Sequence, residues 1–196
     1  MITLKEQLNS KSKMYFNGNK GILVDRDGVL IKNRPDYIKK IEEVIFIDRV
    51  EESVVKLWNY GYSIYVVTNQ AGVAKGLYTI DIVISIHKYI ENHFLKYGKG
   101  IIKWYFCPHR DEDHCNCRKP KTGLLMKAIS ENELDPFQTW MVGDKKSDIE
   151  AGYKAGCKTA LVETGWGKDQ SFANNIRPNL TSSDFPSFVD HFLQTV

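Results

Sequence analysis

Short apolar runs alternate along the chain with longer segments whose apolar residues recur at helical spacing. The first run, residues 21–24, is typical of a buried strand, and residues 50–60 place Val50, Val54 and Leu57 on one helical side. Further strands are predicted at 63–67, 101–106, 139–142 and 159–163, and further helices at 80–97, 122–132, 147–155 and 185–193. This alternation indicates βαβ units. We therefore predict an α/β fold, a three-layer Rossmann-like parallel sheet with helices on both faces.

Polar residues follow three of the predicted strands. Asp25 and Asp27 come after the first strand, residues 68–69 (TN) after the second and residues 143–144 (GD) after the fourth. Ligands of open α/β sheets bind in the crevice at the carboxyl ends of the strands. One polar motif in a loop would be ordinary, but three at matching strand ends indicate an active site.

The pair Asp25 and Asp27 has the chemistry of a metal or catalytic site. Two carboxylates this close repel each other unless a cation lies between them or one of them holds a proton. They suit Mg²⁺, which prefers oxygen ligands, and they can divide the roles of nucleophile and acid–base. The alternative is an ordinary turn, because Asp and the following Gly28 are common turn residues.

The other motifs supply hydrogen-bond donors, positive charge and further carboxylates. The Thr68 hydroxyl and the Asn69 amide can donate to phosphate oxygens, or they can simply end a strand. Residues 118–121 (RKPK) can offset phosphoryl charge, or they can be solvated surface charge. Asp144, directly after a strand, suits a metal ligand, whereas Asp148 can favour a helix N-terminus.

Composition sets broad limits on the class of protein. Of the 196 residues, 42% are hydrophobic and 26% charged, as in an ordinary globular protein, and we expect one domain at residues 20–196. Residues 1–19 form an N-terminal extension of unknown role, with Thr3 and Glu6 as a possible capping box. Since neither a membrane span nor a secretory signal is evident, we expect a cytoplasmic protein without a membrane partner. The net charge of +3 does not indicate a nucleic-acid partner, and we expect a monomer.

Three of the four cysteines lie within eleven residues of one another, which favours a metal site over a disulfide framework. Cys107, Cys115 and Cys117, with either His109 or His114, supply three thiolates and one imidazole. This is a complete tetrahedral set for structural Zn²⁺, and it predicts a zinc-stapled loop. The alternative is a reduced loop without metal.

Four motifs in chain order, D-R-D-G-V, T-N-Q, R-K-P-K and G-D-K-K-S-D, resemble those of the haloacid dehalogenase superfamily of phosphotransferases. The resemblance implies a hydrolase, a phosphoric monoester phosphatase, in which Asp25 is the nucleophile and forms an aspartyl-phosphate. Asp27 would protonate the leaving oxygen and then activate water. Thr68 and Lys119 would hold the phosphoryl oxygens.

The same resemblance implies catalytic Mg²⁺ bound by Asp25, the backbone carbonyl of Asp27, and Asp144. Many members of the superfamily carry a large cap domain, but the segments between the motifs are too short for one here. We therefore expect loops to cover the site. The expected substrate contacts are Asn33, Arg34, Asp36, Tyr37, Asn69, Gln70, Arg118 and Lys145. Arg118 is predicted to contact a second, non-reacting phosphate.

A narrower resemblance comes from the cysteine loop. The C-P-H sequence near C-R-K-P is similar to that of the D-glycero-D-manno-heptose 1,7-bisphosphate 7-phosphatases and of the histidinol-phosphate phosphatases, and it favours His109 over His114 as the zinc ligand. The stretches VVTNQAGVAKG and TGWGK and the lysine of GDK are more similar to the heptose enzymes. The resemblance implies Mg-dependent hydrolysis of the 7-phosphate of a small phosphorylated metabolite, a sugar bisphosphate of heptose biosynthesis.

Other functions stay open. Histidinol-phosphate phosphatase is the alternative among enzymes, and a catalytically silent, zinc-stabilised binding module is the alternative of another class. The module would need at least one missing catalytic group, and none is missing. A polynucleotide 3′-phosphatase is disfavoured by the modest charge and by the absence of a kinase-type P-loop from the sequence.

Overall fold

The computed structural model describes residues 19–98, 100–101, 103–172 and 176–196. The expected N-terminal extension, residues 1–19 with Thr3 and Glu6 as a possible capping box, lies outside this part of the chain apart from Asn19. Asn19 forms a β-bridge with Leu134 ahead of the first strand. Among the described residues, no helix has both the length and the apolar character needed to cross a membrane.

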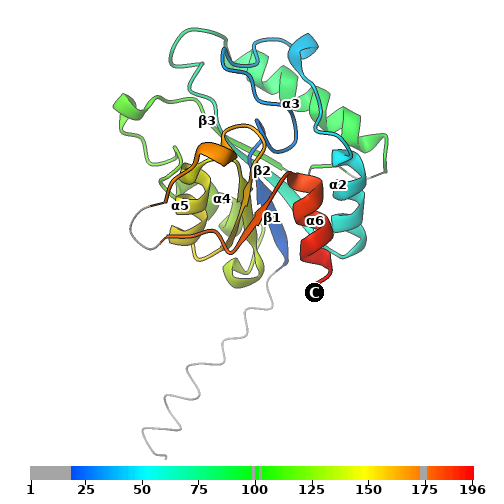
Figure 1. Ribbon diagram of the computed structural model, residues 1–196. Coiled ribbons are helices and arrows are strands. Elements are labelled where there is room, and N and C mark those ends of the chain that lie inside the picture. The colour runs from blue at the N-terminus through cyan, green and yellow to red at the C-terminus, as the bar shows by residue number, and fades with distance from the viewer. Residues whose placement is uncertain (1–18, 99, 102, 173–175) are drawn as a thin grey trace, which may run out of the picture.

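A six-stranded sheet forms the centre of the molecule (Figure 1). Its strands are β1 (Gly21–Val24), β2 (Ser63–Asn69), β3 (Lys103–Cys107), β4 (Trp140–Gly143), β5 (Lys158–Val162) and β6 (Leu180–Ser182). Every neighbouring pair is parallel, and the order across the sheet is β3-β2-β1-β4-β5-β6. This is the doubly wound order of Rossmann-like sheets.

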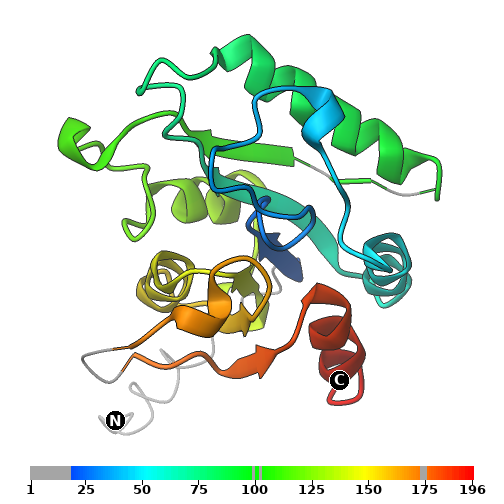
Figure 2. The ribbon, with the colours of Figure 1, turned by 45° about the horizontal axis from the view of Figure 1, so that its top comes forward.

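Helices cover both faces of the sheet, which confirms the predicted three-layer fold (Figure 2). The α-helices are α2 (Val50–Asn59), α3 (Ile80–Leu95), α4 (Gly123–Glu131), α5 (Lys146–Lys154) and α6 (Phe185–Leu193). Short 3-10 helices are η1 (Ile41–Glu43), η2 (Asp111–Asp113), η3 (Pro136–Gln138) and η4 (Gly167–Asp169). Within the described ranges, the chain between β1 and α3 has no further sheet or helical domain, as expected for a site without a large cap.

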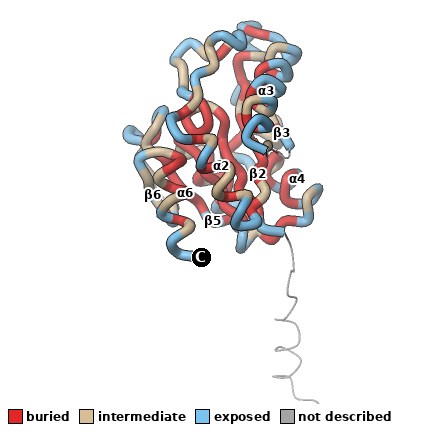
Figure 3. Tube along the Cα trace, turned by 90° about the vertical axis from the view of Figure 1, so that its right-hand side faces the viewer, coloured by how far each residue is buried: buried red, intermediate tan, exposed pale blue. Residues whose placement is uncertain are grey.

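The first strand shows why both faces need cover. Ile22 and Val24 pack in one core cluster with residues of α2, α3 and α6, whereas Leu23 packs in a second cluster with residues of α4 and α5. All four residues of β1 are buried, so the strand has no polar face. Figure 3 shows the buried positions running through the middle of the molecule, with the exposed positions on its outer side.

Two strands differ from the sequence prediction. β3 begins at Lys103 rather than at residue 101 and continues to Cys107, so the first predicted zinc ligand belongs to the strand. The prediction contains no counterpart of β6, because this strand has only three residues and one large apolar side chain, Leu180. The other elements end within two residues of their predicted limits.

The strand order brings the predicted motifs together. β1 pairs with both β2 and β4, so the carboxyl ends of these three strands are neighbours. Successive strands are added outward from β1 in one direction as far as β3 and in the other direction from β4 onward. The place between β1 and β4 is therefore a topological switch point, where open α/β sheets bind ligands. Asp25 follows β1 directly, and its backbone N–H donates to the carbonyl oxygen of Val142 at 2.9 Å, which ties this end to β4.

Candidate active site

A cluster of three buried carboxylates lies at the switch point. Asp25 follows β1, Asp144 follows β4, and Asp148 lies in the first turn of α5. Each offers a carboxylate oxygen, and these oxygens all lie within 4.8 Å of one another. Asp25 and Asp144 are brought together as the sequence predicts. Asp148 joins them, although the sequence suggested only a helix N-terminal role for it.

Lys119 balances part of this negative charge. Its Nζ atom lies 3.2 Å from Oδ1 of Asp25 and 2.7 Å from Oδ1 of Asp148, and the ammonium also donates to the carbonyl oxygen of Val67. Burial disfavours the charged lysine, but the neighbouring Asp148 and Asp25 outweigh it and raise the pKa of Lys119. Burial likewise disfavours the Asp25 carboxylate, but Lys119 and Lys145 outweigh it and lower the pKa of Asp25.

Asp144 is the carboxylate with the least compensation. Burial, followed by the charges of Asp25 and Asp148, raises the pKa of Asp144 to about 7. The backbone N–H of Trp166 donates to its Oδ2 at 2.9 Å, whereas its Oδ1 is buried without a hydrogen-bond partner. A Cβ atom at Gly165 would lie 2.1 Å from Oδ2, so this close approach requires glycine. Buried oxygen donors with uncompensated charge are a donor set that fits Mg²⁺.

The Asp27 carboxylate is held apart from this cluster by its own partners. The guanidinium of Arg26 donates to both Asp27 oxygens at 2.9–3.1 Å, and the Gln70 amide donates to Oδ2 at 3.0 Å. β1 ends at Val24, so both carboxylates lie beyond the strand, and the alternation of strand side chains does not place them on one face. The backbone after β1 therefore sets their orientation.

Thr68 and Asn69, at the end of β2, contact other residues of the site. Thr68 is only 1% exposed, and its hydroxyl accepts a hydrogen bond from the Gln70 amide at 3.0 Å. The Asn69 amide donates to the carbonyl oxygen of Lys119 at 3.0 Å and accepts from the backbone N–H of Lys119 at 3.1 Å. Asn69 thus ties the Lys119 segment to the sheet.

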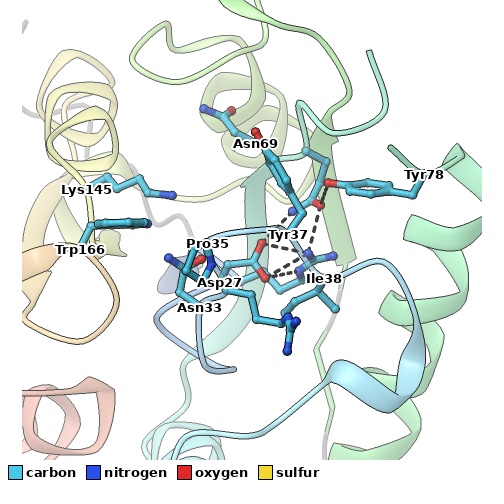
Figure 4. Close-up of a pocket in the computed structure, with 12 residues that line it drawn as sticks. Asp27, Asn33, Pro35, Tyr37, Ile38, Asn69, Tyr78, Lys145 and Trp166 are labelled. Carbon is cyan, nitrogen blue, oxygen red and sulfur yellow. Dashed lines mark hydrogen bonds and ion pairs between the residues drawn. The ribbon is translucent and has the colours of Figure 1, made fainter. Parts of the chain in front are cut away.

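A cavity of about 180 Å³ opens beside Asp27 (Figure 4). Its walls are Arg26, Asp27, Asn33, Arg34, Pro35, Tyr37, Ile38, Asn69, Gln70, Tyr78, Lys145 and Trp166. Lys145 and Trp166 lie on one side of it and Tyr78 on the other. A second cavity of about 400 Å³ shares Asn33, Pro35 and Trp166 with the first, and so continues the same groove.

Six of the eight predicted substrate contacts line the first cavity: Asn33, Arg34, Tyr37, Asn69, Gln70 and Lys145. Asp36 and Arg118 do not line it. Asp36 forms ion pairs at the surface with Arg34 and Lys39. These partners, Arg34 first, lower the pKa of Asp36 to about 2. Arg118 pairs with Asp111, its Nε lying 2.7 Å from Oδ1 of the aspartate.

The cysteine loop after β3 gathers four metal-ligand atoms. The Sγ atoms of Cys107, Cys115 and Cys117 lie 3.2–3.6 Å apart, and Nδ1 of His109 lies 3.5 Å from the first and 3.3 Å from the last. His109, not His114, belongs to this group. A tetrahedron of sulfur and nitrogen atoms is the donor set of structural zinc, so the residues fit Zn²⁺.

Comparison with known proteins identifies the family. A family model described as HAD-hydrolase-like matches residues 116–187. A relative from Neisseria meningitidis serogroup A is 38% identical over 147 residues, covering 75% of this chain and 79% of its own. One from Haemophilus influenzae is 38% identical over 154 residues, covering 75% of this chain and 83% of its own. Both are named D-glycero-beta-D-manno-heptose-1,7-bisphosphate 7-phosphatase.

This chain belongs to the haloacid dehalogenase-like family. Solved structures of the family agree with the fold. The D,D-heptose 1,7-bisphosphate phosphatase from B. bronchiseptica, solved with magnesium and phosphate, has a TM-score of 0.84 and 27% identity, covering 90% of this chain and 99% of its own. The D,D-heptose 1,7-bisphosphate phosphatase from Burkholderia thailandensis has a TM-score of 0.66 and 27% identity, covering 89% of this chain and 98% of its own.

Four residues of this haloacid dehalogenase-like site were not predicted as site residues from the sequence. Arg26 is buried against Asp27, and Tyr78 is buried against Gln70. Asp148 pairs with Lys119, and Trp166 forms part of the wall that the two cavities share. The position of Arg26 between two aspartates in the sequence could have indicated that its charge pairs with one of them. Tyr78 carried none, because its contact with Gln70 depends on how the turn after β2 folds.

Proposed function

We propose that this protein is a Mg²⁺-dependent phosphatase that removes the 7-phosphate of D-glycero-D-manno-heptose 1,7-bisphosphate through an aspartyl-phosphate at Asp25. The observation that carries the proposal is the pairing of Asp25 with Lys119 at the switch point of the sheet. The charges of Lys119 and Lys145 lower the pKa of Asp25 despite its burial, which keeps the carboxylate ionised, as a nucleophile requires. Residues 20–196 would act as one catalytic unit.

The reaction would take two steps at one phosphorus atom. In the first, an oxygen of Asp25 attacks phosphorus, the bond to the sugar oxygen breaks, and Asp27 gives that oxygen its proton. In the second, water attacks the aspartyl-phosphate, Asp27 takes the proton of the water, and the bond between phosphorus and Asp25 breaks. Inorganic phosphate leaves, and both carboxylates return to their first state.

Two lysine ammonium groups and one hydroxyl around Asp25 would hold the phosphoryl oxygens during both steps. Lys119 and the Thr68 hydroxyl are buried beside it, and Lys145 adds charge from the start of α5. Phosphoryl transfer depends on such positioning and charge neutralisation. Mg²⁺, held by Asp25, Asp144 and the backbone carbonyl of Asp27, with Asp148 beside it, would neutralise further phosphoryl charge.

The groove supports a sugar bisphosphate as the substrate. The two adjoining cavities offer cations at Arg34 and Lys145 and an aromatic wall at Trp166, which is 43% exposed. The names of the relatives specify a heptose bisphosphate. Zn²⁺ bound by the cysteine loop would be structural, because four protein ligands leave no open position for a substrate.

Rates on two substrates test the assignment. We expect release of phosphate from the heptose 1,7-bisphosphate to have a kcat/KM at least about 10²-fold above that for histidinol phosphate, because two phosphates engage the cations of the groove. A malachite-green assay on purified protein with Mg²⁺ measures both. A preference for histidinol phosphate would support the alternative enzyme, and no release from either would support the silent module.

Arg118 tests recognition of the second phosphate. We expect Arg118→Ala to raise KM for the bisphosphate about 10-fold to 100-fold, the value of one charge-assisted contact, and to leave KM for a monophosphate unchanged. Because Asp111 competes for the guanidinium at 2.7 Å, Asp111→Asn should lower KM for the bisphosphate. Arg110→Ala removes an exposed arginine of the same loop as a matched control. An Arg118→Ala enzyme with ordinary KM and turnover would exclude this contact.

A further inference from the structure

The side-chain amide of Gln70 is the centre of a buried hydrogen-bond network. Its Nε2 donates to Oδ2 of Asp27 and to the Thr68 hydroxyl, each at 3.0 Å. Its Oε1 accepts from Nη2 of Arg26 at 3.0 Å and from the Tyr78 hydroxyl at 2.9 Å. Gln70 is 1% exposed, and all four hydrogen-bonding positions of its amide are used within the protein.

Arg26 and Tyr78 together hold the oxygen end of this amide. The Arg26 guanidinium can only donate, so Oε1 has to face it, and the Tyr78 hydroxyl donates to the same oxygen. With Oε1 turned towards Tyr78 and Arg26, the NH₂ group has to face Asp27 and Thr68. The turn after β2 is shaped for this contact, because a Cβ atom at Gly72 would lie 2.2 Å from the Tyr78 ring.

The network leaves the Asp27 carboxylate little freedom. Arg26, which is buried, donates to both oxygens of Asp27 and to Gln70. Gln70 directly follows β2, and its hydrogen bond ties Asp27 to that end of the sheet. The same amide links Asp27 to Thr68, beside Asp25. A hydrogen bond from a fixed donor is the usual way in which a protein orients an acid–base group.

We propose that Tyr78 and Gln70 are positioning residues that orient Asp27 for proton transfer to the leaving oxygen. The inference rests on the proposed function, since it takes Asp27 as the acid and base. The competing explanation is that the network only packs the turn after β2. The two differ in one observable, the dependence of the phosphorylation step on the leaving group.

The experiment compares leaving groups that need a proton with one that does not. A sugar alkoxide needs the proton of Asp27, whereas 4-nitrophenolate is stable enough to leave without it. We expect Tyr78→Phe and Gln70→Met to slow phosphorylation of Asp25 by a sugar monophosphate about 10-fold to 100-fold, part of the full effect of a general acid. Rapid-quench measurement with 4-nitrophenyl phosphate should show an unchanged rate of Asp25 phosphorylation. It should also show a burst of nitrophenolate, because these variants slow the later attack of water, which Asp27 activates.

Two variants make the result decisive. Tyr105→Phe removes another largely buried hydroxyl, which hydrogen-bonds Glu131 and Asn132 away from this network, and both rates should stay as in the unmodified enzyme. Asp27→Asn should also slow phosphorylation by the sugar monophosphate but not by 4-nitrophenyl phosphate, and by a larger factor than the two other variants. If Asp27→Asn slows both substrates equally, the proposed role of Asp27 fails. If Asp27→Asn is selective while Tyr78→Phe and Gln70→Met slow both substrates equally or neither, the positioning role alone is overturned.

Discussion

Replacing Asp25 with asparagine is expected to lower turnover by at least about 10⁴-fold, the scale on which loss of a single nucleophile acts. The amide is nearly the same size as the carboxylate but cannot form a stable ester with phosphate. It also leaves Lys119 paired with Asp148, so the buried ammonium keeps a partner. The fold should therefore survive, and phosphate release under saturating substrate measures the loss.

The matched control is Asp48→Asn, which changes the same atoms at an exposed position outside the site. It should keep full turnover. Circular dichroism and thermal unfolding of both variants distinguish lost chemistry from lost structure. An Asp25→Asn protein that is folded and fully active would show that the nucleophile lies elsewhere.

Removal of zinc is expected to have the largest effect on stability. Structural zinc sites contribute roughly 10–16 kcal/mol of apparent binding free energy in model peptides. Without the metal, no bond holds the three thiols and the imidazole together. Cys117 stands two residues before Lys119, so a loosened loop also loosens the cation beside Asp25. We expect chelation, or Cys117→Ser, to lower the free energy of unfolding by several kcal/mol and activity at least about 10-fold.

Cys157→Ala is the control for loss of a thiol, because Cys157 is a buried core residue in the α4/α5 cluster and not one of the four ligands. It should cost only about 1 kcal/mol of stability and no zinc. Zinc content is measured by atomic absorption alongside urea unfolding. Metal-free protein with unchanged unfolding and unchanged turnover would contradict the structural role of the site.

The fold followed from the sequence because a doubly wound sheet leaves a simple pattern. Strands such as β1 are buried on both faces and so appear as short apolar runs, and helices such as α2 carry apolar residues at a period of 3.6. β6 escaped the prediction because three residues with one apolar side chain carry no periodicity. Its place in the sheet depends on pairing with β5.

The sequence predicts those site residues that carry reactive side chains at the ends of strands. It does not predict those whose role depends on which side chain they contact. Asp25 and Asp144 follow buried strands, and their convergence follows from parallel pairing. No local pattern tells that Arg118 pairs with Asp111, or that Tyr78 reaches Gln70. Those contacts come from loop conformations, which short-range sequence signals specify poorly.

The central claim is that the carboxylate of Asp25 is covalently phosphorylated during turnover. A crystal structure grown with Mg²⁺ and trifluoroberyllate, which mimics an aspartyl-phosphate, tests it most directly. We predict density for the beryllium adduct on the Asp25 carboxylate, within reach of Lys119 and the Thr68 hydroxyl. An adduct on Asp27, Asp144 or Asp148, or no adduct on a protein that is active under the same conditions, would contradict the account.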